Sequence, residues 1–600
     1  MGTMQKVARA KSKAARKPSN QPTATQNRAG GTAFEISDPA LKLVTMTGGA
    51  FFAEPKFYNA ENCVPKRLAG GKFEKLEQRL QIVKDKLQGF ASCDELDEVA
   101  REVVATAIDV AAGDKPEDTL AIANWLRNEM NIRLTPQVLL VVASKMDNTK
   151  SLVRRYTPHI VKRPDEVKTC LLVFRFLFGM KSLPNGLNFG LGDAISKFGE
   201  RGMVKYDSPD FPKWSDVLQW VKRKKDWPVK DAVAKYFITG KIVDPKATPL
   251  IAARKALSAK TEFDAEAKVL AVESKVNWEV LRSQFKSDAK AVWEYLVEKN
   301  LLGYMAMLRN LRNILQAKVS AETIEKVSAR ISDRDAVLKS KQLPFRFLSA
   351  HKSIDGSFGD FADRNELAAA VELASNYACE NISLPGVTAI FADNSGSMTN
   401  NHVSEKSTVT CSDAANVLCG IVAKACDRAY VYAFAADTRE VRFTKNDTVL
   451  GIAGKVGTGG VNGHNTNAWK IPLLLKEEGL TPDRVIILSD LQAWDDSSMA
   501  GVGGFHARSR LEERAVCDTW ADYVASSAKA KDTWLHCVHL NGYGDTVVDE
   551  GSHVNQVAGF SEKVFGMLLK TEGSLGAVDV DDSDGVPTVE QIRKDWTVNA

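Results

Sequence analysis

The sequence comprises 600 residues with 44% hydrophobic and 26% charged residues, and its 80 Lys and Arg against 75 Asp and Glu give a net charge of +5. A chain of this length exceeds the size at which one hydrophobic core stops growing, so we expect at least two domains. The composition excludes a fibrous or wholly disordered protein, and no apolar run reaches the about 20 residues needed to span a bilayer. Nine scattered cysteines exclude a disulfide framework, so we expect a cytoplasmic protein that makes no membrane contact.

Charge is uneven between the two ends of the sequence. Residues 1–30 carry lysines and arginines but no acid and are rich in Ala, Ser and Gln, which predicts a basic disordered arm. This arm either contacts nucleic acid or remains a solvated tail. Residues 573–600 include the acidic run from Asp579 to Asp584 and are predicted to form an acidic C-terminal segment.

Helical patterns dominate from the end of the arm to about residue 340. After a short strand at Ala33–Ile36, amphipathic spacing predicts helices over Phe73–Leu87, over Thr119–Met130 and from Thr135 onward. Gly and Pro separate further helices, with almost no strand pattern between them. Such a series predicts an α-solenoid of paired helices.

One basic segment of the helical region has aromatic residues between its cations. Cations neutralise phosphates and aromatic faces stack on unpaired bases, so the segment is a candidate RNA contact. The alternative is a solvated helix face whose tryptophans belong to the core. The selected cations are Lys205, Lys213, Lys222, Arg223, Lys224 and Lys225, with Tyr206, Trp214, Trp220 and Trp227 between them.

Strand and helix patterns alternate in the last third of the sequence. A linking stretch over 340–385 is predicted to be irregular around Phe345–Leu348 and to contain a helix over Asn365–Tyr377. Alternating buried strands and helices predict a doubly wound parallel α/β sheet. Strands are expected at 387–392, 430–435, 440–443, 485–488 and 534–540, with helices at 413–426, 468–477, 511–528 and 562–570.

The strand at 387–392 ends in a turn that carries one carboxylate and two hydroxyls, those of Asp393, Ser395 and Ser397. Such oxygens suit a hard cation such as magnesium, and open α/β sheets bind ligands where their strands end. Thr466 on a later loop and Asp490 at the end of a second buried strand offer further oxygens. On its own, the D-x-S-x-S turn would be an ordinary loop.

The D-x-S-x-S turn, the loop threonine and the strand-end aspartate, in this order, resemble the metal-ion-dependent adhesion site (MIDAS) of von Willebrand factor A domains. The resemblance implies that Asp393, Ser395, Ser397 and Thr466 lie closest to a divalent metal ion, expected to be Mg²⁺. It places Asp490 near the ion, through water.

Several stretches of the helical region resemble, in order and spacing, the TROVE module of the Ro autoantigen family. The resemblance implies a multidomain α plus α/β fold. A ring-like α-solenoid of HEAT-like repeats over 31–365 would be followed by a doubly wound, Rossmann-like von Willebrand A domain over 366–572. The stretches are Tyr156–Lys168, Leu183–Leu187, Val204–Tyr206 and Tyr304–Asn313.

The Ro resemblance also implies an activity. It predicts a non-enzymatic RNA-binding protein that binds small structured Y-like RNA on its outer basic surface. Arg309 and Arg312 would line the ring and receive single-stranded 3′ ends of misfolded RNA, unless they pair with acids of the solenoid. His159 is either a further RNA contact or a helix-end histidine with a structural role.

Partners other than RNA follow from the metal site. A cation with an open position would dock a carboxylate of another protein, such as an exoribonuclease, and no DNA is expected. Two alternatives remain open, a metal-dependent docking scaffold with incidental RNA binding and a metal-dependent nuclease. The nuclease would need more converging carboxylates than Asp393 and Asp490.

Overall fold

The structure is a computed structural model that divides into two compact units. The helical unit comprises Pro39–Thr47, Glu54–Val327 and Pro587–Ala600, and the sheet unit comprises Met1–Asp38, Gly48–Ala53 and Ser328–Val586. The structure describes residues 24–26, 32–48, 98–178, 182–207, 212–222, 228–342, 344–354, 360–403, 409–458, 466–490, 515–540, 545–548, 553–558, 564–573 and 588–599.

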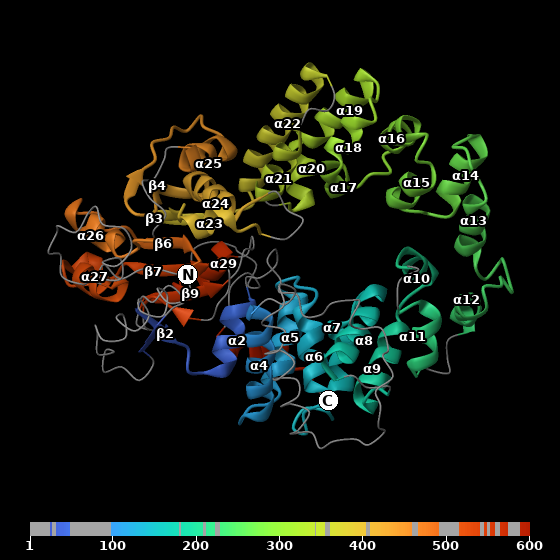
Figure 1. Ribbon diagram of the computed structural model, residues 1–600, viewed down its shortest axis with the longest axis horizontal. Helices are drawn as coiled ribbons and strands as arrows, with labels where there is room; N and C mark the ends of the chain where they lie inside the picture. Colours follow the sequence, from blue (N-terminus) through green and yellow to red (C-terminus); the bar gives the residue numbers. More distant parts are fainter. Residues whose placement is uncertain are drawn as a thin grey trace, which may run out of the picture. The chain divides into compact units, whose positions relative to one another are not determined.

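The helical unit is a succession of short helices, which can be followed by colour along the chain in Figure 1. Neighbouring helices pack in pairs, for example α5 on α6, α7 on α9 and α13 on α14. Its helices are α2 (Pro39–Thr47), α4 (Glu98–Ala112), α5 (Asp118–Asn128), α6 (Thr135–Ala143), α7 (Val153–Ile160), α8 (Pro164–Phe178), α9 (Asn185–Ile195), α10 (Glu200–Lys205), α11 (Trp214–Trp220), α12 (Pro228–Thr239), α13 (Pro249–Ser258), α14 (Ala265–Glu273), α15 (Trp278–Gln284), α16 (Ala289–Glu298), α17 (Tyr304–Arg309), α18 (Leu311–Gln316), the first part of α19 (Ala321–Ile331) and α30 (Val589–Trp596).

Local sequence signals set several of these helix starts. Pro249 stands at the first position of α13, where its missing N–H group costs no hydrogen bond. Asp264 caps α14 by accepting a hydrogen bond from the Ala267 N–H at 2.7 Å. α6 is buried over its whole length because helices of the unit cover it on every side, which explains its continuous apolar sequence.

The last helix of the sequence, α30, belongs to the helical unit and packs on α5. Arg593 forms two hydrogen bonds with the Asp118 carboxylate, at 2.7 and 2.6 Å, and Asp118 is almost fully buried. Asn124 donates to the carbonyl of Trp596 at 2.9 Å. The predicted acidic segment therefore contains a helix that docks on α5, whereas its run from Asp579 to Asp584 lies outside the described residues.

The larger sheet of the sheet unit has six strands in the order β5-β4-β3-β6-β7-β9. All neighbouring strands are parallel except β4 and β5, so the sheet is mostly parallel with one antiparallel edge strand. Its strands are β3 (Leu384–Asp393), β4 (Cys426–Phe434), β5 (Thr438–Glu440), β6 (Arg484–Ser489), β7 (Trp534–His539) and β9 (Val554–Ala558), and a smaller sheet joins β1 (Ala24–Gln26), β2 (Thr32–Glu35) and β8 (Asp545–Thr546).

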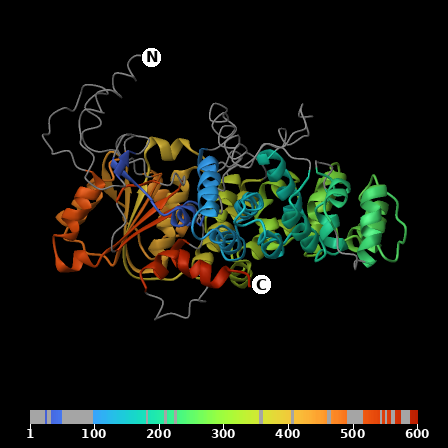
Figure 2. The same cartoon turned by 90° about the horizontal axis from the view of Figure 1, so that it is seen from below.

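Helices cover both faces of the larger sheet, and Figure 2 shows its strands between them. Phe391 and Tyr432 stack at 4.7 Å in the core beneath α26 and α27, and Ile390 points to the opposite face because side chains alternate along a strand. The helices of this unit are α20 (Arg334–Ser340), α21 (Pro344–Ile354), α22 (Phe361–Cys379), α23 (Gly396–Asn400), α24 (Cys411–Ala425), α25 (Val449–Thr458), α26 (Lys470–Glu477), α27 (Val516–Val524), α28 (Ala528–Lys531) and α29 (Val564–Thr571).

Several features differ from the sequence-based expectations. The strand expected at 440–443 is β5 at Thr438–Glu440, and the edge strand β9 had not been predicted. The segment around Phe345–Leu348 is the helix α21, with Pro344 at its first position. β1 forms within the arm that was expected to be disordered, because Ala24–Gln26 pair with Thr32–Phe34. The helix α25 had not been predicted at all. The amphipathic pattern over Phe73–Leu87 lies outside the described residues, and among the helices that are described, none is both long and apolar enough to cross a membrane.

Candidate metal centre and nucleic-acid interface

The carboxyl ends of β3 and β6 bring the sequence-predicted metal ligands to one edge of the sheet. Asp393 is the last residue of β3, and Asp490 follows the last residue of β6, its neighbour in the sheet. Ser395 and Ser397 lie at the start of α23, with their hydroxyl oxygens 3.3 Å apart. Asp393, Ser395 and Asp490 are buried, whereas Ser397 is exposed.

A backbone hydrogen bond of the next residue, Asn467, places Thr466 at the same edge of the sheet. The N–H of Asn467 donates to the carbonyl of Ala435 at 2.9 Å, and Ala435 directly follows β4. Because β4 is the other neighbour of β3, this bond holds the buried Thr466 near the end of β3. The preceding loop residues, including His464 and Asn465, lie outside the described residues, as do Asp495 and Asp496.

The electrostatics of this edge fit a bound cation. The Asp393 carboxylate accepts hydrogen bonds from the Ser395 N–H, at 2.8 Å, and from the Ser489 hydroxyl. Burial and the neighbouring charge of Asp490 raise the pKa of Asp393 to about 7, although these hydrogen bonds act in the opposite direction. Two buried carboxyls in mutual repulsion, beside serine and threonine hydroxyls, are an oxygen donor set that a divalent cation would stabilise.

Asn394, between these ligands, has a different task. Its side chain turns to α24, where it accepts hydrogen bonds from Ser412 and Asn416 and donates to Asn416 at 3.1 Å. This network fixes the turn against the helix that covers the sheet. The sequence pattern did not identify it, because its partners lie 18 and 22 residues away.

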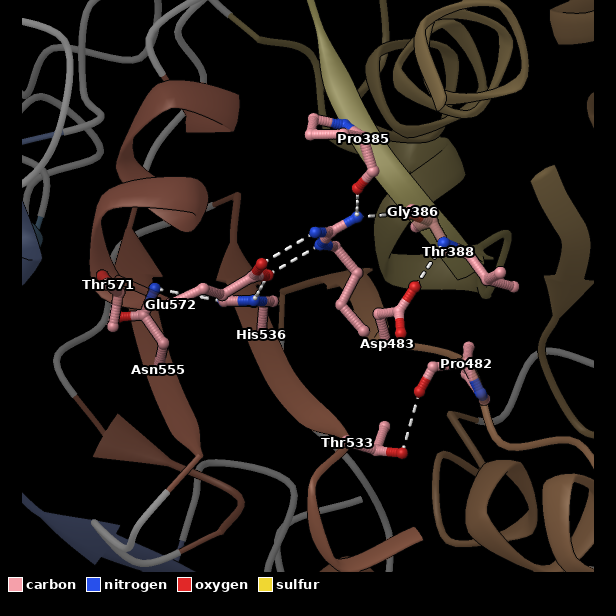
Figure 3. Close-up of polar contacts among 12 residues, drawn as sticks. Pro385, Gly386, Thr388, Pro482, Asp483, Thr533, His536, Asn555, Thr571 and Glu572 are labelled. Carbon is pink, nitrogen blue, oxygen red and sulfur yellow. Dashed lines mark hydrogen bonds and ion pairs between the residues drawn. The ribbon is translucent and has the colours of Figure 1, made fainter. Parts of the chain in front are cut away.

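A second polar cluster occupies the amino ends of the same strands (Figure 3). Arg484, the first residue of β6, forms hydrogen bonds of 2.6 and 2.7 Å with the Glu572 carboxylate. Its guanidinium also donates to the Pro385 carbonyl, and His536 shares Glu572 at 2.8 Å. Burial would raise the pKa of Glu572, but the hydrogen bonds from Arg484 and His536 lower it to about 2. This carboxylate is therefore already neutralised by the protein itself.

In the helical unit, α7, α9 and the chain after α11 bring an exposed aromatic side chain and two cations together. Phe189 on α9 is exposed, and two cations lie over its ring. The Arg154 guanidinium is 5.2 Å from the ring centre and the Lys222 ammonium is 4.8 Å from it. We call these three residues the Phe189 platform. Sequence reasoning selected Lys222 but missed Phe189 and Arg154, although Phe189 stands opposite the apolar face of α9 formed by Leu187 and Leu191.

More cations continue from the platform along α7. Lys197 donates to the Pro158 carbonyl at 3.3 Å, next to the exposed His159. Partial burial and the charges of Lys197 and Lys162 lower the pKa of His159. His159 is thus neutral near pH 7 but surrounded by positive charge, which attracts phosphates. Its own backbone carbonyl accepts a hydrogen bond from Asn128.

The other predicted RNA contacts are separate from the Phe189 platform. Lys205 is exposed beside Tyr206 and lines a small crevice with Arg201, Arg254 and Lys275. Lys213 is exposed at the start of α11. Trp214, by contrast, is fully buried, which agrees with the alternative that the tryptophans of this segment belong to the core. Arg223, Lys224, Lys225 and Trp227 lie outside the described residues.

Arg309 and Arg312 are both exposed, on α17 and α18. The helix breaks between them at Asn310, which is buried, donates to the Ala306 carbonyl at 2.7 Å and accepts from Asn313 at 2.8 Å. Asn310 and Asn313 therefore have a structural role in this turn.

Comparisons with known proteins agree with this architecture. Residues 243–404 match the TROVE domain family. The crystal structure of the Deinococcus radiodurans Ro (Rsr) protein superposes with a TM-score of 0.58 at 18% identity, covering 90% of this chain and all of that one.

Curated relatives match a smaller part. Telomerase protein component 1 of Mus musculus is 24% identical over 336 residues, which are 47% of this chain and 13% of that protein. The protein of the same name from Rattus norvegicus is 24% identical over 298 residues, or 40% of this chain and 11% of its own length. The chain thus spans only about an eighth of these relatives. Together with the helical first region and the mostly parallel six-stranded sheet, the comparisons show that the chain contains a match to the TROVE domain over residues 243–404 and has the fold of the Ro (Rsr) protein.

Proposed function

We propose that this protein is a non-enzymatic RNA-binding protein of the cytoplasm whose helical unit holds the RNA. The observation that carries the proposal is the Phe189 platform, an exposed aromatic ring that two cations contact, on a surface that continues to Lys197 and Lys162. An exposed ring offers a stacking face to a base, while cations beside it neutralise the adjoining phosphates. The TROVE match supports the same assignment.

The finer form of the proposal names two RNA classes. Small structured RNA of the Y-like type would bind the basic outer surface that includes the Phe189 platform, His159 and Lys205. Single-stranded 3′ ends of misfolded RNA would contact Arg309 and Arg312. The protein would then act in RNA quality control or as a ribonucleoprotein scaffold.

The test measures affinity for a small hairpin RNA with a single-stranded tail by fluorescence anisotropy over a range of salt concentrations. Affinity should fall steeply with salt and should persist in EDTA, because phosphate contacts need no metal. The double variant Phe189→Ala with Lys222→Gln should bind at least about tenfold more weakly, since stacking alone contributes about 1–3 kcal/mol per base.

A matched control removes a charge elsewhere. Lys529 is an exposed lysine on α28 of the sheet unit, and Lys529→Gln should leave RNA affinity unchanged. Equal affinity of the platform variant and the wild type would refute the assignment of the surface. Absence of RNA binding by the wild type would refute the function.

For the sheet unit, we propose that Asp393, Ser395, Ser397 and Thr466 hold a divalent metal ion, Mg²⁺, with Asp490 nearby. The ion would supply a Lewis-acidic position to which a carboxylate of a partner protein, such as an exoribonuclease, could bind. The buried, mutually repelling carboxyls support this proposal. Isothermal titration with MgCl₂ and MnCl₂ should give binding that Asp393→Ala abolishes, without any change in RNA affinity. RNA cleavage that disappears in Asp393→Ala would instead favour the nuclease.

A further inference from the structure

A cavity of about 190 Å³ lies next to the Phe189 platform. Its walls combine apolar and aromatic side chains with the polar side chains of Arg175, Ser182 and Asn188. An apolar cavity of roughly 150 Å³ is enough to hold benzene, so this one has room for a single aromatic ring. The lining residues are Leu171, Phe174, Arg175, Ser182, Leu183, Asn188 and Trp220.

One wall of the cavity is built for stacking. The Arg175 guanidinium lies over the Trp220 ring, 4.2 Å from its centre, so a planar cation already contacts the indole. Trp220 is only partly buried, and Phe174 adds a second aromatic surface. Flat, polarisable walls with one positive charge suit a flat, electron-rich ring such as a nucleobase.

Asn188 fixes the cavity to the Phe189 platform. Its side-chain amide donates to the Trp220 carbonyl at 3.2 Å and its oxygen accepts from the Lys222 N–H at 2.7 Å. It therefore ties α9 to the end of α11, with the cavity on one side and Phe189, its neighbour in sequence, on the other. These two bonds hold Asn188 in place, and stacking walls accept any base because every base has a π face.

We propose that this cavity receives one unpaired base of an RNA whose phosphates lie on the Phe189 platform, with little preference for which base it is. The proposal rests on the RNA-binding function proposed above. A base inside a duplex cannot enter, because it would first have to leave its stack. The helical unit would thus recognise RNA that has an unpaired, extruded or single-stranded base beside its cationic surface.

The experiment compares two probes, a 12-nucleotide single strand and the same sequence as a blunt duplex. Trp220→Ala should weaken binding of the single strand by about 5- to 140-fold and leave duplex affinity unchanged. Leu183→Trp, which fills the cavity but keeps Trp220, should have the same selective effect, whereas Trp220→Phe should retain most of the affinity. Trp278→Ala, which removes a partly buried indole from α15, serves as the matched control.

A second measurement does not depend on the folding of any variant. Single abasic substitutions are placed along the strand and bound to the wild-type protein. One position should lose affinity by a similar factor, and restoring any of the four bases there should recover it. The proposal is overturned if no position matters, or if Leu183→Trp binds the strand as tightly as the wild type. If the wild type binds neither probe, the proposed function itself fails.

Discussion

A buried carboxylate lies near each end of β6, and the surroundings shift the pKa of the two carboxylates in opposite directions. At the amino end, Glu572 receives two hydrogen bonds from Arg484 and one from His536, and its pKa falls to about 2. At the carboxyl end, Asp393 faces hydroxyls, a backbone N–H and a second aspartate, and its pKa rises to about 7. The first end is complete without a ligand, because the chain supplies the countercharge. The second is stabilised only when something else supplies it.

The largest loss of stability should come from removing Arg484, the main partner of Glu572 at the amino end of β6. Arg484→Met leaves Glu572 buried without its main partner, and loss of one member of a buried pair costs about 3–5 kcal/mol. The free energy of unfolding from urea titration, followed through the near-ultraviolet signal, measures this. The double variant Arg484→Met with Glu572→Leu should recover part of the loss. No recovery would mean that the cost comes from packing rather than from the isolated charge.

Lowering the pH should gradually reduce the stabilisation that the Arg484–Glu572–His536 cluster gives to the fold. Glu572 has a folded pKa of about 2 against an ordinary value of 4.5, so its stabilisation is full above pH 4.5 and disappears toward pH 2. Burial lowers the pKa of His536 below 6.5, so the unfolded chain takes up that proton first and stability also decreases below pH 6.5. Both contributions have the same sign.

Asp393 acts in the opposite direction, because its pKa is raised. The pH series is therefore best measured in Asp393→Asn, where the urea midpoint should start to fall below pH 6.5, as His536 contributes, and should fall further from pH 4.5 to pH 2, as the stabilisation by Glu572 is lost. A midpoint that rises on acidification would contradict the description of the Arg484 cluster.

A substitution at Gly386, on the amino-end side of the sheet, should lower stability by a smaller amount and leave the metal site at the other end unaffected. Gly386, near the start of β3, has φ +93°, and an added Cβ would lie 2.6 Å from a carboxylate oxygen of Asp483. Gly386→Ala should cost about 1–2 kcal/mol, since the left-handed region penalises a side chain by that amount. Metal affinity, measured by titration calorimetry, should not change. In contrast, Gly454→Ala in α25 meets nothing within 4 Å and should be neutral or slightly stabilising.

The smallest effect, and the most diagnostic in sign, should come from Asp393→Asn. In EDTA, we expect a change below about 1 kcal/mol, or a slight gain, because the substitution removes repulsion between buried carboxyls. Adding MgCl₂ should raise the melting temperature of the wild type and leave that of the variant unchanged. A large loss in EDTA would show that Asp393 is a structural carboxylate like Glu572.

The sequence was most informative where neighbours along the chain carry the signal. Apolar runs ending in Asp393 and Asp490 predicted β3 and β6, and their shared sheet edge followed from parallel topology. The helix α21 was missed although Phe347, Ala350 and Ile354 have helical spacing behind a proline. Gly451, Gly454 and Gly457 weaken the helical signal of α25, because glycine disfavours helix interiors.

Long-range pairs could not be predicted. Nothing near Arg484 points to Glu572, 88 residues later, and nothing in α5 points to Arg593. The Phe189 platform is similar, since Arg154 and Lys222 come from different segments of the sequence. Local patterns give elements and strand-end ligands, whereas partnerships between distant side chains require the folded chain.

The docking of α30 determines how the protein can be divided for experiments. The largest part of the sheet unit, residues 328–586, lies in the sequence between two parts of the helical unit, so a fragment that stops before residue 587 lacks a piece of the helical unit. Such a fragment would leave Asp118 without Arg593 and Tyr156 without the Val598 N–H that donates to it at 3.1 Å. A minimal RNA-binding fragment should therefore join residues 39–327 to 587–600 through a flexible linker, and weak binding by a simple truncation would report on a damaged scaffold.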